Sequence, residues 1–267
     1  MVVFPNAKIN LGLNILEKRP DGYHELETCF YPVPWKEALE IIPSSKTEVT
    51  TSGIEIPEDG DNIILKAYQL LRSDYELPDV KIHLHKAIPI GAGLGGGSAD
   101  AAFTLTLLNN LFSLELKDDQ LINYASRLGA DCAFFIKNRP MLARGIGEIL
   151  TAANITLTGK YILLVYPNVH ISTKEAYSNI TPKSPNLSIK DILDEFEPAD
   201  WKEHLKNDFE ESLFDTYPIL QQMKAELYNS GAFYASMSGS GSCMYGLYEK
   251  EPELDFPSDY TVWSGKL

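Results

Sequence analysis

The N-terminal part of the chain shows the alternation of apolar and polar positions that is typical of β-strands. Leu11, Leu13 and Ile15 alternate with small or polar residues, and a second apolar stretch follows at 26–33 after a Pro-Asp-Gly turn. This arrangement predicts a hairpin with Asp21-Gly22 near its tip. Short strands are expected next at 39–42 and 48–56, and then at 80–85, where every second residue is polar and one side of the strand faces solvent.

Helical periodicity, with apolar residues three and four positions apart, takes over further along. It predicts helices over 61–71, 98–112, 119–128, 189–196 and 218–229. Asp61 is the expected N-cap of the first helix. A strand is predicted at 161–166, a strand–turn–strand unit at 233–248 and a last short strand at 262–263.

The periodicity lapses at 151–160, which suggests a boundary between two domains, 1–155 and 156–267. A length of 267 residues, with 44% hydrophobic and 22% charged residues, is compatible with globular domains of that size. No apolar stretch of about twenty residues occurs, so no membrane span is expected. The first residues lack the pattern of a secretory signal.

Three cysteines, Cys29, Cys132 and Cys243, lie far apart, without the spacing of a zinc site or a disulfide framework. We therefore expect a cytoplasmic protein. The net charge of −14 argues against a nucleic-acid partner. It also means that any site for an anion must provide its own local positive potential.

A cluster of five glycines in seven residues, within 91–97, supplies such a potential. Without Cβ atoms the backbone turns tightly and brings its N–H groups against a phosphate. The helix predicted from Ser98 adds the positive end of its dipole. Small alanines after Ser98 let its first turns approach neighbouring backbone closely.

Two common phosphate-binding motifs do not explain this cluster. Gly91, Gly93 and Gly96 satisfy G-x-G-x-x-G, but a dinucleotide-binding strand is apolar on both faces and opens its domain, whereas the strand before this cluster has a polar face. A P-loop requires Lys-Ser/Thr after its last glycine, and that pair is absent here.

The segment from Pro89 to Ala99 resembles the second motif of the galacto-, homoserine-, mevalonate- and phosphomevalonate-kinase superfamily, Pro-x-x-x-Gly-Leu-Gly-Gly-Gly/Ser-Ser-Ala. The segments 5–11 and 238–243 resemble the first and third motifs. The resemblance implies that ATP is bound by one set of residues in the second motif: Pro89, Gly91, Gly93, Leu94, Gly95, Gly96, Gly97, Ser98 and Ala99. Mg²⁺ is expected with ATP, and Ser98 is its candidate ligand by analogy with the superfamily.

Two further segments, Arg-Pro-Asp-Gly-Tyr-His at 19–24 and Leu-Gly-Ala-Asp-Cys at 128–132, resemble one family of this superfamily, the 4-diphosphocytidyl-2-C-methyl-D-erythritol kinases. The resemblance implies that Asp131 accepts the proton of the reacting hydroxyl. It also implies that Lys8 lies beside Asp131, keeps it ionised and stabilises the developing alkoxide. Asn10 resembles the family residue near the substrate hydroxyl.

The same resemblance assigns the recognition of a cytosine base. Tyr23 would pack on the cytidine, and His24 would hydrogen-bond the polar edge of the base, since imidazole offers one donor and one acceptor. The segment 172–177, which includes Thr173, would bring Tyr177 as a second stacking ring. Ser238 and Gly239 of the third motif complete the expected substrate contacts.

The implied fold is α+β in two domains. The N-terminal domain would contain a left-handed βαβ unit, and the C-terminal domain would be ferredoxin-like. The implied function is ATP-dependent phosphorylation of the 2-hydroxyl of cytidine-diphospho-methylerythritol by a monomer or homodimer. Two alternatives remain open: another small-molecule kinase of the superfamily, of the homoserine or mevalonate type, and a nucleotide-binding regulator without catalysis.

Overall fold

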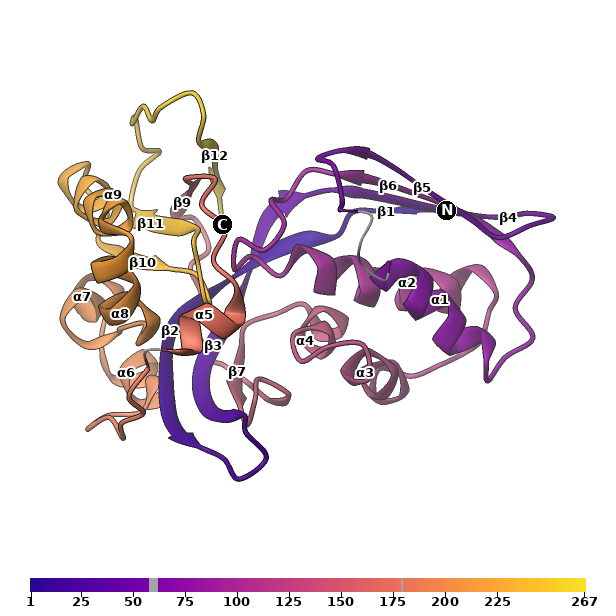
Figure 1. The fold of residues 1–267 in the computed structure, drawn as a ribbon, viewed down its shortest axis with the longest axis horizontal. Coiled ribbons are helices and arrows are strands. Elements are labelled where there is room, and N and C mark those ends of the chain that lie inside the picture. The colour runs from indigo at the N-terminus through magenta and orange to yellow at the C-terminus, as the bar shows by residue number, and fades with distance from the viewer. Residues whose placement is uncertain (58–61, 179) are drawn as a thin grey trace. The chain divides into compact units, whose positions relative to one another are not determined.

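In the computed structural model, which describes residues 1–57, 62–178 and 180–267, the chain forms two compact units. The first unit contains 1–7, 35–90 and 95–139, and the second contains 8–34, 91–94 and 140–267. Both units are therefore built from segments distant in the sequence (Figure 1). The predicted boundary between two domains near residue 155 stays a prediction.

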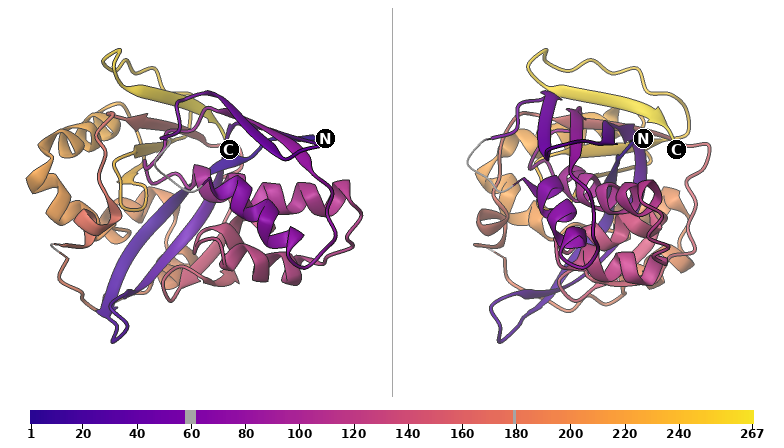
Figure 2. Two further views of the ribbon diagram at one scale, coloured as in Figure 1. Left: turned by 45° about the vertical axis from the view of Figure 1, so that its right-hand side comes forward. Right: turned by 90° about the vertical axis from the view of Figure 1, so that its right-hand side faces the viewer.

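The first unit is a four-stranded sheet covered on one face by helices, as the views in Figures 1 and 2 show. The strand order is β1-β4-β6-β5, in which β5 and β6 are parallel and the other pairs are antiparallel. The strands are β1 (Val2–Val3), β4 (Ala38–Pro43), β5 (Glu48–Gly53) and β6 (Val80–Lys86). The helices are α1 (Ile63–Arg72), α2 (Gly96–Leu111), α3 (Asp118–Ser126) and α4 (Cys132–Lys137).

Strand β6 shows how the sequence pattern sets this layering. Val80, Ile82 and Leu84 are buried against the helices, whereas the residues between them are exposed, as their alternation predicted. The exposed His83 forms hydrogen bonds with the hydroxyls of Thr50 and Ser52 on β5. The polar face of the sheet thus has its own cross-strand pairs, and the predicted strand is confirmed.

Helix α1 connects the parallel strands β5 and β6, which gives the expected βαβ unit; its left-handedness stays a prediction. The predicted cap Asp61 lies outside the described residues. Asn62 caps the helix, since its side-chain oxygen accepts hydrogen bonds from the backbone N–H groups of Ile64 and Leu65. Buried residues of α1 and α2 share one core with β4 and β6.

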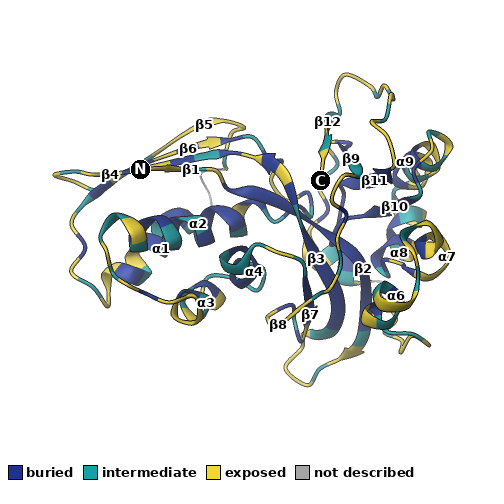
Figure 3. Cartoon of the chain, turned by 180° about the vertical axis from the view of Figure 1, so that it is seen from behind, coloured by how far each residue is buried: buried dark blue, intermediate teal, exposed yellow. Residues whose placement is uncertain are grey.

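The second unit contains two four-stranded sheets. In the first, with strand order β2-β3-β7-β8, two long strands form the predicted hairpin, and a turn over 19–23 joins them. Most of β2 and the middle of β3 are buried, which Figure 3 shows in dark blue. The strands are β2 (Asn6–Lys18), β3 (His24–Lys36), β7 (Met141–Arg144) and β8 (Ile149–Ala152).

The second sheet of this unit has the strand order β10-β11-β9-β12, and all its pairs are antiparallel. Numbered along the chain, this is the 2-3-1-4 order of a ferredoxin-like split βαβ, which confirms the predicted C-terminal fold. Between β11 and β12, where that fold has a second helix, residues 249–260 are not helical. The strands are β9 (Tyr161–Tyr166), β10 (Tyr234–Met237), β11 (Met244–Tyr248) and β12 (Thr261–Lys266).

Helices fill the long connection between β9 and β10. The last of them packs against β10 and β11. They are α5 (Thr173–Ser178), α6 (Ile189–Glu195), the 3₁₀ turn η1 (Pro198–Asp200), α7 (Trp201–His204), α8 (Phe209–Thr216) and α9 (Pro218–Asn229). None of the helices within the described ranges is long and apolar enough to cross a membrane.

Candidate active site

The glycine cluster folds into a loop that ends in the first turn of α2. Gly91, Gly93 and Gly95 have φ angles of 68°, 80° and 71°, a region that L-residues rarely adopt. Gly95 precedes the helix, so the N–H groups of Gly96, Gly97 and Ser98 have no carbonyl partner inside α2. The first turn contains no acidic residue. The start of α2 is therefore suited to bind an anion.

The middle of this loop, 91–94, belongs to the second unit and contacts both of the other motifs there. The backbone N–H of Lys8 donates to the carbonyl oxygen of Leu94 at 2.9 Å. The hydroxyl of Ser238 donates to the carbonyl oxygen of Gly93 at 2.8 Å, and the N–H of Cys243 donates to that of Ala92 at 3.2 Å. The second unit thus brings together parts of three motifs that are far apart in the sequence.

A chain of side-chain hydrogen bonds starts at Lys8 on β2. The ammonium donates to Oδ1 of Asn10 at 2.6 Å, and Nδ2 of Asn10 donates to the hydroxyl of Thr28 on β3 at 3.0 Å. Thr28 in turn donates to the carbonyl oxygen of Gly12 at 2.5 Å. Lys8 and Asn10 are only 4% and 2% exposed, so these bonds fix both side chains in a buried environment.

The ammonium of Lys8 also lies 5.0 Å from the centre of the Phe30 ring, a cation–π contact. Thr28 was not among the predicted residues. It lies outside the motifs of the sequence, and its contact with Asn10 becomes visible only in the fold.

Ser238 and Gly239 lie in the turn between β10 and β11. The side-chain amide of Asn207 donates to the carbonyl oxygens of Met237 and Gly239, both at 2.8 Å. A Cβ atom on Gly239 would come within 3.3 Å of Oδ1 of Asn10, so the turn lies against the Lys8–Asn10 pair. Asn207 is buried and was also missed, since no motif surrounds it in the sequence.

The aromatic residues gather at the start of β3. The ring of His24 stacks on Tyr177 with centroids 4.7 Å apart and planes at 19°, and Tyr177 contacts the Phe209 ring edge-on at 4.8 Å. Tyr23 is 60% exposed, and Thr173 begins α5 in an exposed position. The predicted sandwich of a base between Tyr23 and Tyr177 stays a prediction.

The protonation of His24 follows from this environment. Partial burial, and to a smaller extent the charge of Lys18, lower the pKa of His24 below its usual value. At neutral pH the imidazole is therefore uncharged and presents one donor and one acceptor.

In the first unit, Asp131 directly precedes α4 and is partly exposed. The next residue, Cys132, is buried. Burial raises the pKa of the Cys132 thiol to about 11, opposed by a hydrogen bond with Ser98. Helices α2 and α4 pack against each other in the first unit, and Ser98 and Asp131 both lie at helix N-termini there.

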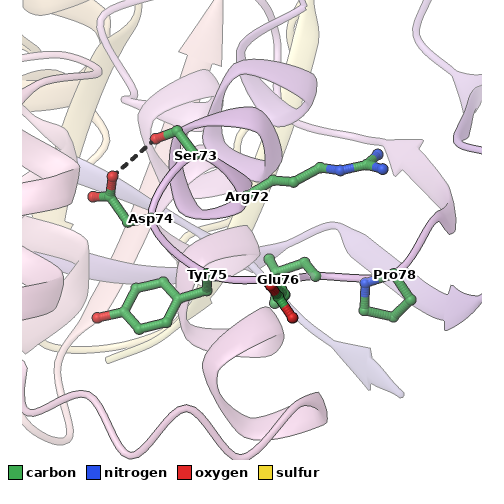
Figure 4. A pocket seen from close by; sticks show the side chains of 7 residues that line it. Arg72, Ser73, Asp74, Tyr75, Glu76 and Pro78 are labelled. Carbon is green, nitrogen blue, oxygen red and sulfur yellow. Dashed lines mark hydrogen bonds between the residues drawn. The ribbon is translucent and has the colours of Figure 1, made fainter.

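A cavity of about 470 Å³ lies just after α1 and is lined by residues 72–78 (Figure 4). Arg72 and Asp74 at its edge form hydrogen bonds with Asp79 and Tyr124, respectively. None of the predicted site residues lines this cavity, and nothing in it suggests the chemistry of the motifs.

Comparison with known proteins identifies the family. The family described as "GHMP kinases N terminal domain" matches residues 62–139, and "GHMP kinases C terminal" matches residues 188–256. A 4-diphosphocytidyl-2-C-methyl-D-erythritol kinase of Bacteroides fragilis is 52% identical over 268 residues, which cover 97% of each chain. The chain belongs to the 4-diphosphocytidyl-2-C-methyl-D-erythritol kinase family. It is a small-molecule kinase.

Solved structures agree with this family. A crystal structure of 4-(cytidine 5'-diphospho)-2C-methyl-D-erythritol kinase superimposes with a TM-score of 0.79 at 33% identity, covering 92% of this chain and 90% of that one. The homoserine kinase of Cytophaga hutchinsonii superimposes with a TM-score of 0.67 at 16% identity, covering 98% and 94%. The similarity to the homoserine kinase shows a shared fold only. The predicted two-domain kinase fold is thereby confirmed.

Proposed function

We propose that this kinase transfers the γ-phosphoryl group of ATP to the 2-hydroxyl of 4-(cytidine 5'-diphospho)-2-C-methyl-D-erythritol and releases ADP, a step in non-mevalonate isoprenoid precursor synthesis. The name of the relatives supports the acceptor. The choice of this acceptor rests on the stacked rings of His24 and Tyr177. Tyr23, which directly precedes His24, is exposed. A kinase for homoserine or mevalonate has no base to stack.

The phosphates of ATP are proposed to bind at the start of α2. The N–H groups of Gly96, Gly97 and Ser98 donate to phosphate oxygens, and the helix dipole adds to the attraction. Backbone groups thus provide the local positive potential that a protein of net charge −14 requires. The glycines before α2 carry no side chains of their own, so their N–H groups could serve the same purpose.

Phosphoryl transfer forms a bond between the 2-oxygen of the acceptor and the γ-phosphorus, and breaks the bond from that phosphorus to the bridging oxygen of ADP. We propose that the carboxylate of Asp131 accepts the proton of this hydroxyl. Lys8 stabilises the negative charge that develops on the oxygen. Asn10 fixes the direction of the Lys8 ammonium, because Oδ1 of Asn10 accepts its hydrogen bond.

Mg²⁺ is proposed to accompany ATP. The described residues contain no group of three or more His, Cys, Asp or Glu that could hold a metal ion. This fits a cation that is bound mainly by phosphate oxygens and water, and takes one or two oxygens from the protein. The hydroxyl of Ser98, at the start of α2, is a suitable hard ligand. When bound, the cation neutralises charge on the phosphates.

Location and assembly belong to the proposal as well. All three cysteines are buried and free, which is typical of a protein in a reducing compartment and supports the cytoplasm. We propose a monomer or a homodimer that binds small-molecule substrates, without a nucleic-acid or membrane partner.

The activity is tested with purified protein, Mg-ATP and the cytidine-diphospho sugar alcohol, by following ADP release and locating the new phosphate by ³¹P NMR. We expect turnover with this acceptor and none with homoserine or mevalonate. Turnover only with one of those alcohols would refute the acceptor. Binding of ATP without turnover of any acceptor would favour a regulator instead.

The assignment of Asp131 has its own test. Asp131→Asn removes the proton acceptor with little change in shape, so kcat should fall by roughly 10²- to 10⁴-fold. The matched control is Asp119→Asn, because that carboxylate lies in the same unit and its side chain is 97% exposed. If Asp131→Asn kept the kcat of the unmodified enzyme, the proposed mechanism would be wrong even with the acceptor confirmed.

A further inference from the structure

The first unit buries three charged side chains that the proposed mechanism does not use. Lys86, the last residue of β6, is 3% exposed; Glu37, between β3 and β4, and Asp100, in α2, are each 2% exposed. The Lys86 ammonium donates to Oε1 of Glu37 at 2.7 Å and to Oδ2 of Asp100 at 2.8 Å. We call these residues the buried ion cluster. Burying charges costs free energy even when they are paired, so a stabilising role alone does not explain the cluster.

The buried ion cluster holds the segment that enters the glycine loop. Oε2 of Glu37 accepts hydrogen bonds from the backbone N–H groups of Ala87 and Ile88 at 3.0 and 3.1 Å. These residues directly follow β6 and precede Pro89, where the motif begins. A carboxylate that accepts two backbone bonds and one from an ammonium has little freedom to move.

The same cluster holds the segment that leaves the loop. Asp100 lies in α2 just after the turn that offers N–H groups to phosphate, and it is bound to the Lys86 ammonium. A Cβ atom on Gly96 would come within 3.0 Å of Nζ of Lys86 and 3.4 Å of Oε1 of Glu37. Gly96 lacks the positive φ of the preceding glycine, so backbone conformation does not require a glycine there. A side chain at this position would instead be tightly packed against Lys86, Ile88 and Glu37.

We propose that Glu37, Lys86 and Asp100 are positioning residues for ATP: they fix the entrance and the exit of the glycine loop relative to each other, and so hold the phosphate-binding N–H groups in place. The proposal rests on the kinase activity proposed above. Its expected signature is a loss of ATP affinity with little change in the KM of the alcohol or in kcat.

The two oxygens of Asp100 have different surroundings. Oδ2 accepts a hydrogen bond from the Lys86 ammonium, whereas Oδ1 is buried without a hydrogen-bond partner. The contact with Lys86 is therefore the bond that ties this side chain of α2 to the end of β6.

The experiment measures the Kd of a non-hydrolysable ATP analogue by calorimetry, together with steady-state kinetics, at pH 7.5. For Glu37→Gln we expect the Kd of the analogue and the KM of ATP to rise by about tenfold, with the KM of the alcohol and kcat changed by less than about threefold. Gly96→Ala should act in the same direction. The matched control is Glu48→Gln, since Glu48 pairs with Lys81 on the exposed face of the same sheet, and it should change neither value.

Asp100→Asn is the second variant, because it keeps the shape of the side chain and should fold. It removes the charge that the Lys86 ammonium binds, so we expect its Kd for the analogue to rise as for Glu37→Gln. A folded Glu37→Gln variant with unchanged ATP affinity would overturn the proposal. Calorimetry with the analogue needs no acceptor, so failure of the proposed acceptor would be seen separately.

Discussion

The orientation of Asn10 is fixed by the groups on both sides of its side-chain amide. Its oxygen can face only the Lys8 ammonium, since an ammonium has no acceptor, and its nitrogen then faces Thr28. The hydroxyl of Thr28 in turn donates to the carbonyl oxygen of Gly12, which leaves its oxygen free to accept from Asn10. A change at Thr28, which need not touch substrate, should therefore reach the reacting groups through Asn10.

We predict that Thr28→Val lowers kcat by about tenfold and changes the KM of ATP little, because Nδ2 of Asn10 loses its acceptor and the direction of Lys8 is less well fixed. The free energy of unfolding of the variant should also be lower by about 1–3 kcal/mol, which is the cost of a buried donor without a partner. Steady-state kinetics and urea unfolding measure the two effects. Thr28→Ser keeps the hydroxyl and is the control; equal kcat values for the valine and serine variants would contradict the prediction.

His24 gives a prediction about pH and stability. Its pKa in the folded protein lies below its usual value, first because of burial and then because of Lys18. The unfolded state therefore binds a proton at higher pH than the folded state, and the free energy of unfolding decreases as the pH falls through about 6.5. Urea unfolding at pH 7.5 and 5.5 should show a smaller decrease for His24→Gln than for the unmodified protein. The opposite order would mean that His24 is charged in the fold.

Residues of this kind also show where sequence reasoning reaches its limit. Lys8 and Asn10 lie in a motif, and their contact follows from their positions two apart on one strand. Glu37 and Lys86 are 49 positions apart, and no local pattern predicts that two charged residues are buried together. Asn207 likewise lies far from the turn that it supports.

At the scale of elements, the glycine loop contains two glycines with opposite surroundings. Gly93 has a φ of 80°, and a Cβ atom there would overlap the carbonyl oxygen of Ser238. A Cβ atom on Gly97 meets no atom within 4 Å. The first glycine is required by the fold of the second unit, whereas the second is open toward the space where phosphate is proposed to bind.

We predict that Gly93→Ala lowers the free energy of unfolding by about 1–3 kcal/mol, since it adds both backbone strain and a steric conflict. Gly97→Ala should change the free energy of unfolding by less than about 0.5 kcal/mol, because the added methyl group meets no other protein atom. It should nevertheless raise the KM of ATP if phosphate approaches the backbone there. Urea unfolding compares the two variants directly, and equal losses of stability would contradict the expected difference.

Elements with strong periodicity were predicted well, and short ones were not. β9 and α9 have the predicted bounds, and the hairpin of β2 and β3 was expected from its alternation and its Asp-Gly turn. β7 and β8 contain four residues each, and β8 is mostly exposed, so neither leaves a hydrophobic pattern. Their position is set by pairing with β3 and with each other, which is a tertiary effect.

At the scale of the whole molecule, the two-domain α+β fold and the family followed from motifs in their order along the chain, and both are confirmed. The compact units could not be predicted in the same way. The first 34 residues are shared between the two units, because β2 and β3 are long strands that leave one unit and continue in the other. Sequence patterns describe neighbours along the chain, and this division depends on neighbours in space.

The net charge of −14 leads to a prediction about salt. Like charges repel most in the compact state, and salt screens them, with a Debye length of about 30 Å at 0.01 M and about 10 Å at 0.1 M. The free energy of unfolding at pH 7.5 should therefore rise when sodium chloride is raised from 0.01 to 0.1 M. Urea, which is uncharged, is the denaturant to use. A decrease would show that attractive ion pairs outweigh the net repulsion.

The close approach of Gly96 to the buried ion cluster has a consequence for evolution. Four positions, 37, 86, 96 and 100, constrain one another although they are scattered over the first unit. A lineage that replaced Lys86 with a shorter, uncharged residue would no longer need both carboxylates, and space would open for a larger residue at position 96. Among related kinases, the residues at these four positions should therefore either all be kept or be substituted together.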